Sequence, residues 1–154
     1  MFEMFDLKNG VISVFGVKIS ADAVPEALEA LPDGLVSKKT SKYGHKHFKF
    51  QQYIPADGVH MYLEVLFFAG EKIPQANLYP VIPDSVKDTG HGERAKYCLE
   101  ASKRWLKAMI RETVGSELEE SISYPFGVGY LYAGLRHSRD YGLMGGEIRV
   151  RFED

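Results

Sequence analysis

Alternation of apolar and polar residues over positions 35–68 constrains the fold more than any other feature of the sequence. A period of two residues is typical of strands that bury one face. The segment IPADGV, residues 54–59, interrupts the alternation with turn-forming residues and predicts a reversal between two antiparallel strands. A turn at this place predicts that the following residues lie opposite each other: Ile54 and Val59, Gln51 and Tyr62, Phe50 and Leu63, Lys49 and Glu64, and Phe48 and Val65. This register separates an apolar face from a polar face.

Turn and cap residues indicate further elements on both sides of this hairpin. Asn9-Gly10 separates two apolar-rich runs and predicts a hairpin with strands over 2–8 and 11–19. Pro25 fits the first turn of a short helix that Pro32 and Gly34 end. The piece NLYPVIP reads as a strand, and because Pro80 cannot donate a ladder hydrogen bond, we expect this strand at a sheet edge or a bulge.

A long amphipathic helix and a last hairpin follow. Three-and-four spacing over 93–114 gives the helix an apolar stripe of Ala95, Cys98, Leu99, Trp105, Leu106, Met109 and Ile110. Basic residues cover much of the remaining helix surface. Towards the C-terminus, GVGYLYAGL and EIRVRF flank SRDYGLMGG and predict two more strands. The glycines of FGVG and LMGG read as a bulge and a turn.

Together these elements predict one α+β domain over residues 1–154 with the order ββ-α-βββ-α-ββ. A chain of 154 residues with 45% hydrophobic residues is long enough to bury one substantial core. We expect an antiparallel sheet built from hairpins, with one short and one long helix packed on it.

Composition excludes several classes of protein. The N-terminal residues MFEMFDLKNG carry acids where a secretory signal has basic residues, and no apolar run reaches the ~18 residues that span a bilayer. Cys98 is the only cysteine, which excludes an internal disulfide and the multi-cysteine zinc patterns. We therefore expect a cytoplasmic protein without a membrane partner.

The segment YGHKHFKF, residues 43–50, raises the question of a metal site. In a strand, His45 and His47 lie on the same face as Lys49, and two imidazoles can contribute to a zinc site. A third ligand is needed, and His60 lies far along the predicted ladder. We interpret the pair as part of a solvated strand face and expect no bound metal.

Residues 81–95 resemble the acyl-CoA-binding motif of the GNAT acetyltransferases. The resemblance rests on Val81, Pro83, Gly90 and Gly92 ahead of the long helix, whose N-terminal amides would hold a pyrophosphate. The chain departs from the motif by having Lys87 in place of Arg or Gln and by lacking a second strand–helix–strand unit. A helix start capped by its own polar residues is the alternative interpretation, and it implies no cofactor.

Charge points instead to a protein partner. Positions 35–54 carry five lysines and no acid, whereas the whole chain has a formal charge of −2. That acidic balance disfavours nucleic acid and favours docking onto an acidic protein surface. The expected partner-binding residues are Lys42, Lys46, Lys49, Lys103, Lys107 and Arg111. The acidic regions 22–33 and 115–120 remain an alternative face for a basic partner.

Two further segments bear on function: the closing segment GVGYLYAGLRHSRDYGLMGGEIRVRF and the strand YLEVLFF before the long helix. With these segments, the general form of the chain resembles the bacterial immunity proteins that neutralise toxins delivered between competing cells. The resemblance implies a non-enzymatic, bacterial protein that captures a cognate toxin. The alternative function is a small enzyme of acetyltransferase type that binds acyl-CoA or a nucleotide through residues 87–94.

Overall fold

The α+β class predicted from the sequence is confirmed by a computed structural model that describes residues 4–6, 11–87, 93–110, 121–126, 129–138 and 142–152. The strands are β1 (Met4–Asp6), β2 (Val11–Val14), β3 (Val17–Ile19), β4 (Val36–Thr40), β5 (Lys46–Phe50), β6 (Ile54–Ala56), β7 (Val59–Phe67), β8 (Gln75–Pro80), β9 (Ser121–Phe126), β10 (Gly129–Ser138) and β11 (Gly142–Phe152). The helices are α1 (Pro25–Glu29) and α2 (Glu93–Ile110).

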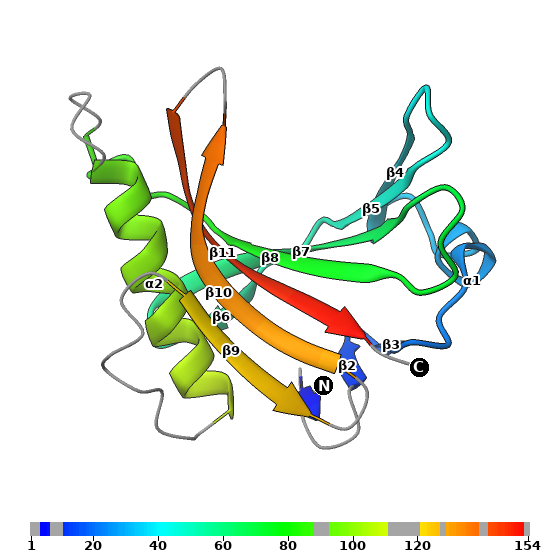
Figure 1. The fold of residues 1–154 in the computed structure, drawn as a ribbon, viewed down its shortest axis with the longest axis horizontal. Helices are drawn as coiled ribbons and strands as arrows, with labels where there is room; N and C mark the ends of the chain where they lie inside the picture. The colour runs from blue at the N-terminus through cyan, green and yellow to red at the C-terminus, as the bar shows by residue number, and fades with distance from the viewer. Residues whose placement is uncertain are drawn as a thin grey trace.

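Two antiparallel sheets are present in the described residues. The smaller has the order β1-β2-β3, and the larger has the order β4-β5-β7-β8-β11-β10-β9 with β6 also paired to β7. Figure 1 shows α2 along one side of the curved larger sheet, with the β4–β5 hairpin projecting at the opposite end of the molecule. The smaller sheet contributes Ile12, Val14 and Ile19 to the same core as the larger one.

The N-terminal segment forms two hairpins in place of the one predicted. β1 pairs with β2 as expected from Asn9-Gly10, although residues 7–10 themselves lie outside the described residues. The single strand predicted over 11–19 is wrong because the chain reverses at Phe15 and Gly16, with φ values of 49° and 80°. Two consecutive positive φ angles are the signature of a type I′ turn. Phenylalanine is not among the residues that favour such turns, so the sequence did not indicate a reversal at Phe15.

The central hairpin has the predicted register at its base and a different one at its tip. Phe48 lies opposite Val65 and Lys49 opposite Glu64, as predicted. At the tip, however, Ile54 pairs with Met61 and not with Val59. Asp57 and Gly58 form the turn, with φ values of 50° and 73°. The irregular segment 51–53 contains two extra residues relative to β7, and these absorb the difference between the two registers.

The alternation expected over 35–68 is wrong at its start, where β4 is a separate strand that the sequence pattern does not reveal. Its residues VSKKT are exposed apart from Val36 and do not alternate between apolar and polar types. β4 pairs with β5 across a turn at residues 41–45. His45 therefore lies in a turn, and the assignment of both histidines to one strand is wrong.

The strand β8 is an interior strand, so the predicted edge position is wrong. It pairs with β7 on one side and with β11 on the other. Val81 donates to the His60 carbonyl of β7, so the amide position of Pro80 points to the β11 side. Pairing with β11 ends at Leu78. Proline is tolerated because the missing N–H falls where the ladder has already stopped.

Helix α2 packs on the apolar face of the larger sheet, where it contacts β7, β8 and β11. Phe48, Phe50, Leu63, Val65 and Trp105 are all buried in one core, as the sequence predicts. Met109 packs against this core at its margin, and Cys98 is buried. The side chains of Ala95, Leu99, Leu106 and Ile110, which complete the predicted stripe, lie outside those described.

Two side chains fix α2 to the β6–β7 hairpin. The indole Nε1 of Trp105 donates to the Ile54 carbonyl at 2.8 Å, and the ring is fully buried. The preceding residue, Arg104, donates to the Asp57 carbonyl at 2.7 Å and to the Asp57 carboxylate at 3.2 Å. A buried hydrogen bond and an exposed ion pair therefore attach α2 to the β6–β7 hairpin.

The C-terminal part contains one more strand than predicted. β9 pairs with β10, and β10 pairs with a β11 that begins at Gly142. The predicted turn SRDYGLMGG therefore lies largely within strands. The register shifts between Arg136 and His137, so the glycines of LMGG accompany a bulge in place of a turn. Neither helix, over its described residues, is long and apolar enough to cross a membrane.

Candidate protein-binding surface

The β4–β5 hairpin, residues 36–50, carries a turn that is fixed by its own hydrogen bonds. We call this segment the basic hairpin. The Ser41 hydroxyl accepts the N–H groups of Tyr43 and His45 at 3.3 and 3.1 Å, and the Ser41 N–H donates to the His45 carbonyl at 2.8 Å. Gly44 takes a φ of +84°, a conformation that favours glycine. These hydrogen bonds stabilise the backbone conformation of the hairpin tip.

His45 joins this tip to the neighbouring β7–β8 connection. Its Nδ1 atom accepts the N–H of Ala69 at 2.9 Å, and its ring stands edge-on to Phe68 with 5.4 Å between centroids. An imidazole nitrogen can accept only when it carries no proton. The bond therefore requires the neutral ring with its hydrogen on Nε2.

Removing the imidazole is expected to release this link. In His45→Phe the N–H of Ala69 loses its side-chain acceptor, so the hydrogen-exchange protection factor of this amide should be lower than in the wild-type protein. An unchanged protection factor in His45→Phe would contradict the assignment of Nδ1 as the acceptor.

Two of the five lysines of the basic hairpin pair with acidic side chains at the surface. Lys38 pairs with Asp33 at 3.0 Å and donates to the Glu29 and Leu31 carbonyls at the end of α1. Lys46 pairs with Glu29 at 2.7 Å. That hydrogen bond raises the pKa of Lys46, so the contribution of the pair is complete below pH 10.5 and is lost as the pH rises above it.

The other three lysines have no acidic partner among the described residues. Lys39, Lys42 and Lys49 are all exposed. Lys42 lies over the Tyr43 ring at 5.0 Å, and Lys49 lies over the Tyr62 ring at 4.4 Å. These cation–π contacts orient the ammonium groups without cancelling their charge. The basic hairpin therefore presents uncompensated positive charge next to aromatic surface.

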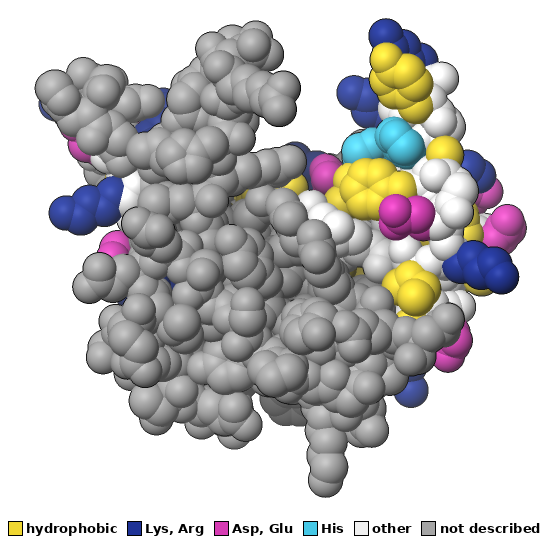
Figure 2. All heavy atoms as spheres, in the orientation of Figure 1, with side chains coloured by type: hydrophobic (Ala, Val, Ile, Leu, Met, Phe, Trp, Pro, Cys, Tyr) yellow, Lys and Arg dark blue, Asp and Glu magenta, His cyan; other side chains and the backbone are white. Residues whose placement is uncertain are grey.

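Tyr43 stands at the tip of the basic hairpin with 69% of its surface exposed. It is the most exposed of the large hydrophobic side chains in the described residues, ahead of Val24 and Tyr53. Figure 2 shows basic, hydrophobic and histidine side chains gathered around this end of the molecule. Tyrosine on a rigid support next to basic groups is a frequent anchor of protein interfaces.

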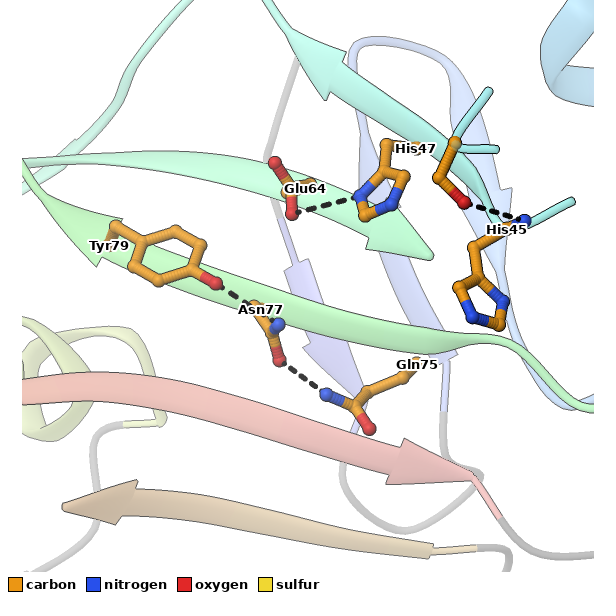
Figure 3. Close-up of polar contacts among 7 residues, drawn as sticks. His45, His47, Glu64, Gln75, Asn77 and Tyr79 are labelled. Atoms are coloured by element: carbon orange, nitrogen blue, oxygen red, sulfur yellow. Dashed lines mark hydrogen bonds and ion pairs between the residues drawn. The ribbon is translucent and has the colours of Figure 1, made fainter. Parts of the chain in front are cut away.

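A polar face of the larger sheet adjoins the basic hairpin. Figure 3 shows its side chains on β5, β7 and β8. His47 and Glu64 approach to 3.7 Å between Nδ1 and Oε1. Along β8, Gln75 donates to Asn77 at 3.0 Å, and Asn77 donates to the Tyr79 hydroxyl at 3.1 Å. Because both ends of its amide are bonded, Asn77 can be 4% exposed without a lost hydrogen bond.

Sequence reasoning did not single out this ladder on β8. Its signal is the period of two that places Gln75, Asn77 and Tyr79 on one face of β8, with Ala76 and Leu78 on the other. The Tyr79 ring also stacks on Tyr62 of β7 with 5.2 Å between centroids. The sequence pattern instead predicts the piece NLYPVIP only as a strand at a sheet edge or a bulge, because of Pro80.

The structure separates the residues expected to bind a partner. Lys42 and Lys49 belong to one exposed surface with Lys39, which had not been selected, whereas Lys46 is engaged by α1. Lys103 is half-buried on α2, at the other end of the molecule from the basic hairpin (Figure 1). The Lys107 side chain and the whole of Arg111 lie outside the described residues.

The other sites considered from the sequence are a metal site, the acyl-CoA-like motif and the acidic region 115–120. Within the part of the chain that the structure describes, no group of three His, Cys, Asp or Glu side chains could hold a metal ion. Gly90 and Gly92 of the acyl-CoA-like motif, with Asp88 and Thr89, lie outside the described residues. The acidic region 115–120 also lies outside them. No protein-family model, curated protein or solved structure matches this chain.

Proposed function

We propose that this chain is a protein-binding module whose docking surface is the basic hairpin. The observation that carries the proposal is the group of three exposed lysines beside the exposed Tyr43, which have no acidic partner in the part of the chain that the structure describes. Such charges speed encounter with an acidic surface, and a preordered tyrosine lowers the entropy lost on binding. The hydrogen bonds of Ser41 and His45 supply that preorganisation.

Two observations favour a protein partner over nucleic acid. The polar face beside the basic hairpin contains Glu64, which would repel a phosphate backbone. The chain as a whole has a charge of −2, without the basic surplus that supports binding to phosphates. An acidic protein surface can pair with the lysines while leaving Glu64 at its margin.

The acidic region 22–33 is less suited to be the docking face. Glu29 and Asp33 already pair with Lys46 and Lys38 at the surface, and paired charges contribute less than unpaired ones to steering a partner. The resemblance to immunity proteins gives the partner a more specific identity. We propose that it is a bacterial toxin whose acidic surface the module covers in the cytoplasm.

Photo-cross-linking in the native host tests the proposed surface. A benzophenone amino acid at position 43 should give one protein adduct, whereas the same group at position 96, exposed on α2, should not. Mass spectrometry then identifies the partner for purification. Equal adducts from both positions, or none from position 43, would contradict docking at the basic hairpin.

Association kinetics with the purified partner provide the quantitative test. The triple variant Lys39→Glu, Lys42→Glu, Lys49→Glu should associate at least about tenfold more slowly at low salt and lose most of its salt dependence. The matched control, Lys18→Glu, Lys87→Glu, Lys96→Glu, has the same net charge but changes exposed lysines elsewhere. If the control slows as much as the test variant, the effect is one of net charge and the surface is misassigned.

A further inference from the structure

The backbone of β4 offers one open hydrogen-bonding edge. β4 is the terminal strand of the larger sheet. The Gln51 N–H donates to the Leu35 carbonyl, and the Ser41 N–H donates to the His45 carbonyl. In an antiparallel pair the bonded positions alternate, so positions 37 and 39 also bond towards β5. The N–H and C=O groups of positions 36, 38 and 40 therefore point away from the sheet.

Most of these outward groups have no partner in the described residues. The Val36 N–H donates to the Pro32 carbonyl at 3.1 Å, which closes the first position. No described backbone group bonds to the N–H or C=O of Lys38 or Thr40. The two residues thus present two donors and two acceptors in the geometry that accepts another strand.

The charge beside this edge selects what can pair with it. Lys39 has no acidic partner among the described residues, and Lys42 follows at the tip. Lysines on an edge strand discourage pairing with neutral or basic strands, including a second copy of β4. An acidic strand is instead favoured at this edge, because its carboxylates would pair with the ammonium groups of Lys39 and Lys42.

We propose that β4 binds its partner by strand addition, and that the partner supplies an extended acidic segment. This inference rests on the proposed protein-binding function and specifies its geometry. Backbone hydrogen bonds to Lys38 and Thr40 would supply register, and the lysines of the basic hairpin would supply selectivity for acidic residues. The edge lysines then exclude unwanted strands and admit the cognate one.

Hydrogen exchange with a model peptide tests the geometry without the natural partner. The probe is an acetylated and amidated Glu-Val-Glu-Val-Glu-Val-Glu peptide at about ten times its dissociation constant. Exchange of the Lys38 and Thr40 amides should slow about tenfold, as expected for protons exposed only in the free protein. The Lys39 amide, which already bonds to β5, should not change.

Two control peptides separate strand addition from simple charge attraction. The same sequence N-methylated at every residue keeps its carboxylates but loses its backbone donors, so it should bind at least about tenfold more weakly. A Lys-Val-Lys-Val-Lys-Val-Lys peptide should not bind. In the protein, Lys39→Glu should weaken the acidic peptide about fivefold, whereas Lys87→Glu should not.

Several outcomes would overturn the inference and leave the proposed function standing. Equal binding of the N-methylated peptide would show attraction by charge alone. Chemical-shift changes at Lys42, Tyr43 and Lys49 without protection of Lys38 and Thr40 would place the peptide on the polar face. Protection that rises with protein concentration in the absence of peptide would show pairing between two copies, and no binding at millimolar peptide would also reject strand addition. By contrast, failure of cross-linking at position 43 would reject the docking surface itself.

Discussion

Replacing Trp105 by alanine is expected to lower the free energy of unfolding by about 3–5 kcal/mol. The indole is fully buried, and the substitution leaves a cavity between α2 and the larger sheet. It also leaves the Ile54 carbonyl without its donor. Chemical denaturation followed by circular dichroism measures the loss.

Trp105→Phe separates the two contributions. It keeps most of the buried ring but removes the indole N–H, so the unsatisfied Ile54 carbonyl should account for about 1–3 kcal/mol of the loss. A loss below about 0.5 kcal/mol in Trp105→Ala would show that α2 does not pack on the sheet through this residue. A loss in Trp105→Phe equal to that in Trp105→Ala would assign the whole effect to the hydrogen bond.

Phe50→Ala is expected to cost about 3–5 kcal/mol for a different reason. Phe50 is fully buried in the larger sheet, and its ring stacks on Phe15 of the β2–β3 turn with 5.7 Å between centroids. Loss of the ring therefore removes core volume and the aromatic contact that joins the two sheets. Equilibrium denaturation gives the change in stability.

Amide exchange resolves where that stability is lost. In Phe50→Ala, protection should fall first in β2 and β3, before it falls in β7 and β8. Phe50→Leu, which keeps much of the volume but not the stacking, should have a smaller effect on both regions. Uniform loss of protection across both sheets would show that Phe50 serves the common core and has no special role in attaching the smaller sheet.

Sequence periodicity predicted those parts of the fold that burial determines. The pairs of Phe48 with Val65 and Lys49 with Glu64 follow from alternation, because a shift by one residue would turn every apolar side chain outwards. The same logic identified Cys98 and Trp105 on the buried side of α2.

Periodicity failed where burial places no constraint. Strand β4 is mostly exposed, so its register depends on backbone bonds to β5 that side-chain types do not encode. The Phe15-Gly16 reversal depends on a positive φ at an aromatic residue, which propensity disfavours and tertiary packing against Phe50 supports. The irregular segment 51–53 changes register without changing which residues are apolar.

The candidate surface was also predicted only in part. A cluster of lysines between 35 and 54 was visible in the sequence, but which of them are neutralised was not. Lys46 and Lys38 find Glu29 and Asp33 only because α1 folds back beside β4 and β5. The bond from Ala69 to His45 also joins residues 24 positions apart, a contact that no local pattern contains.

The position of Trp105 has a consequence for how binding can be observed. It is the only tryptophan of the chain, so intrinsic emission at long wavelength reports on the contact between α2 and the β6–β7 hairpin alone. Figure 1 places that contact at the opposite end of the molecule from the basic hairpin. A partner that docks at Tyr43 would leave the Trp105 emission unchanged. Tryptophan fluorescence would therefore report unfolding of this protein but not binding of its partner.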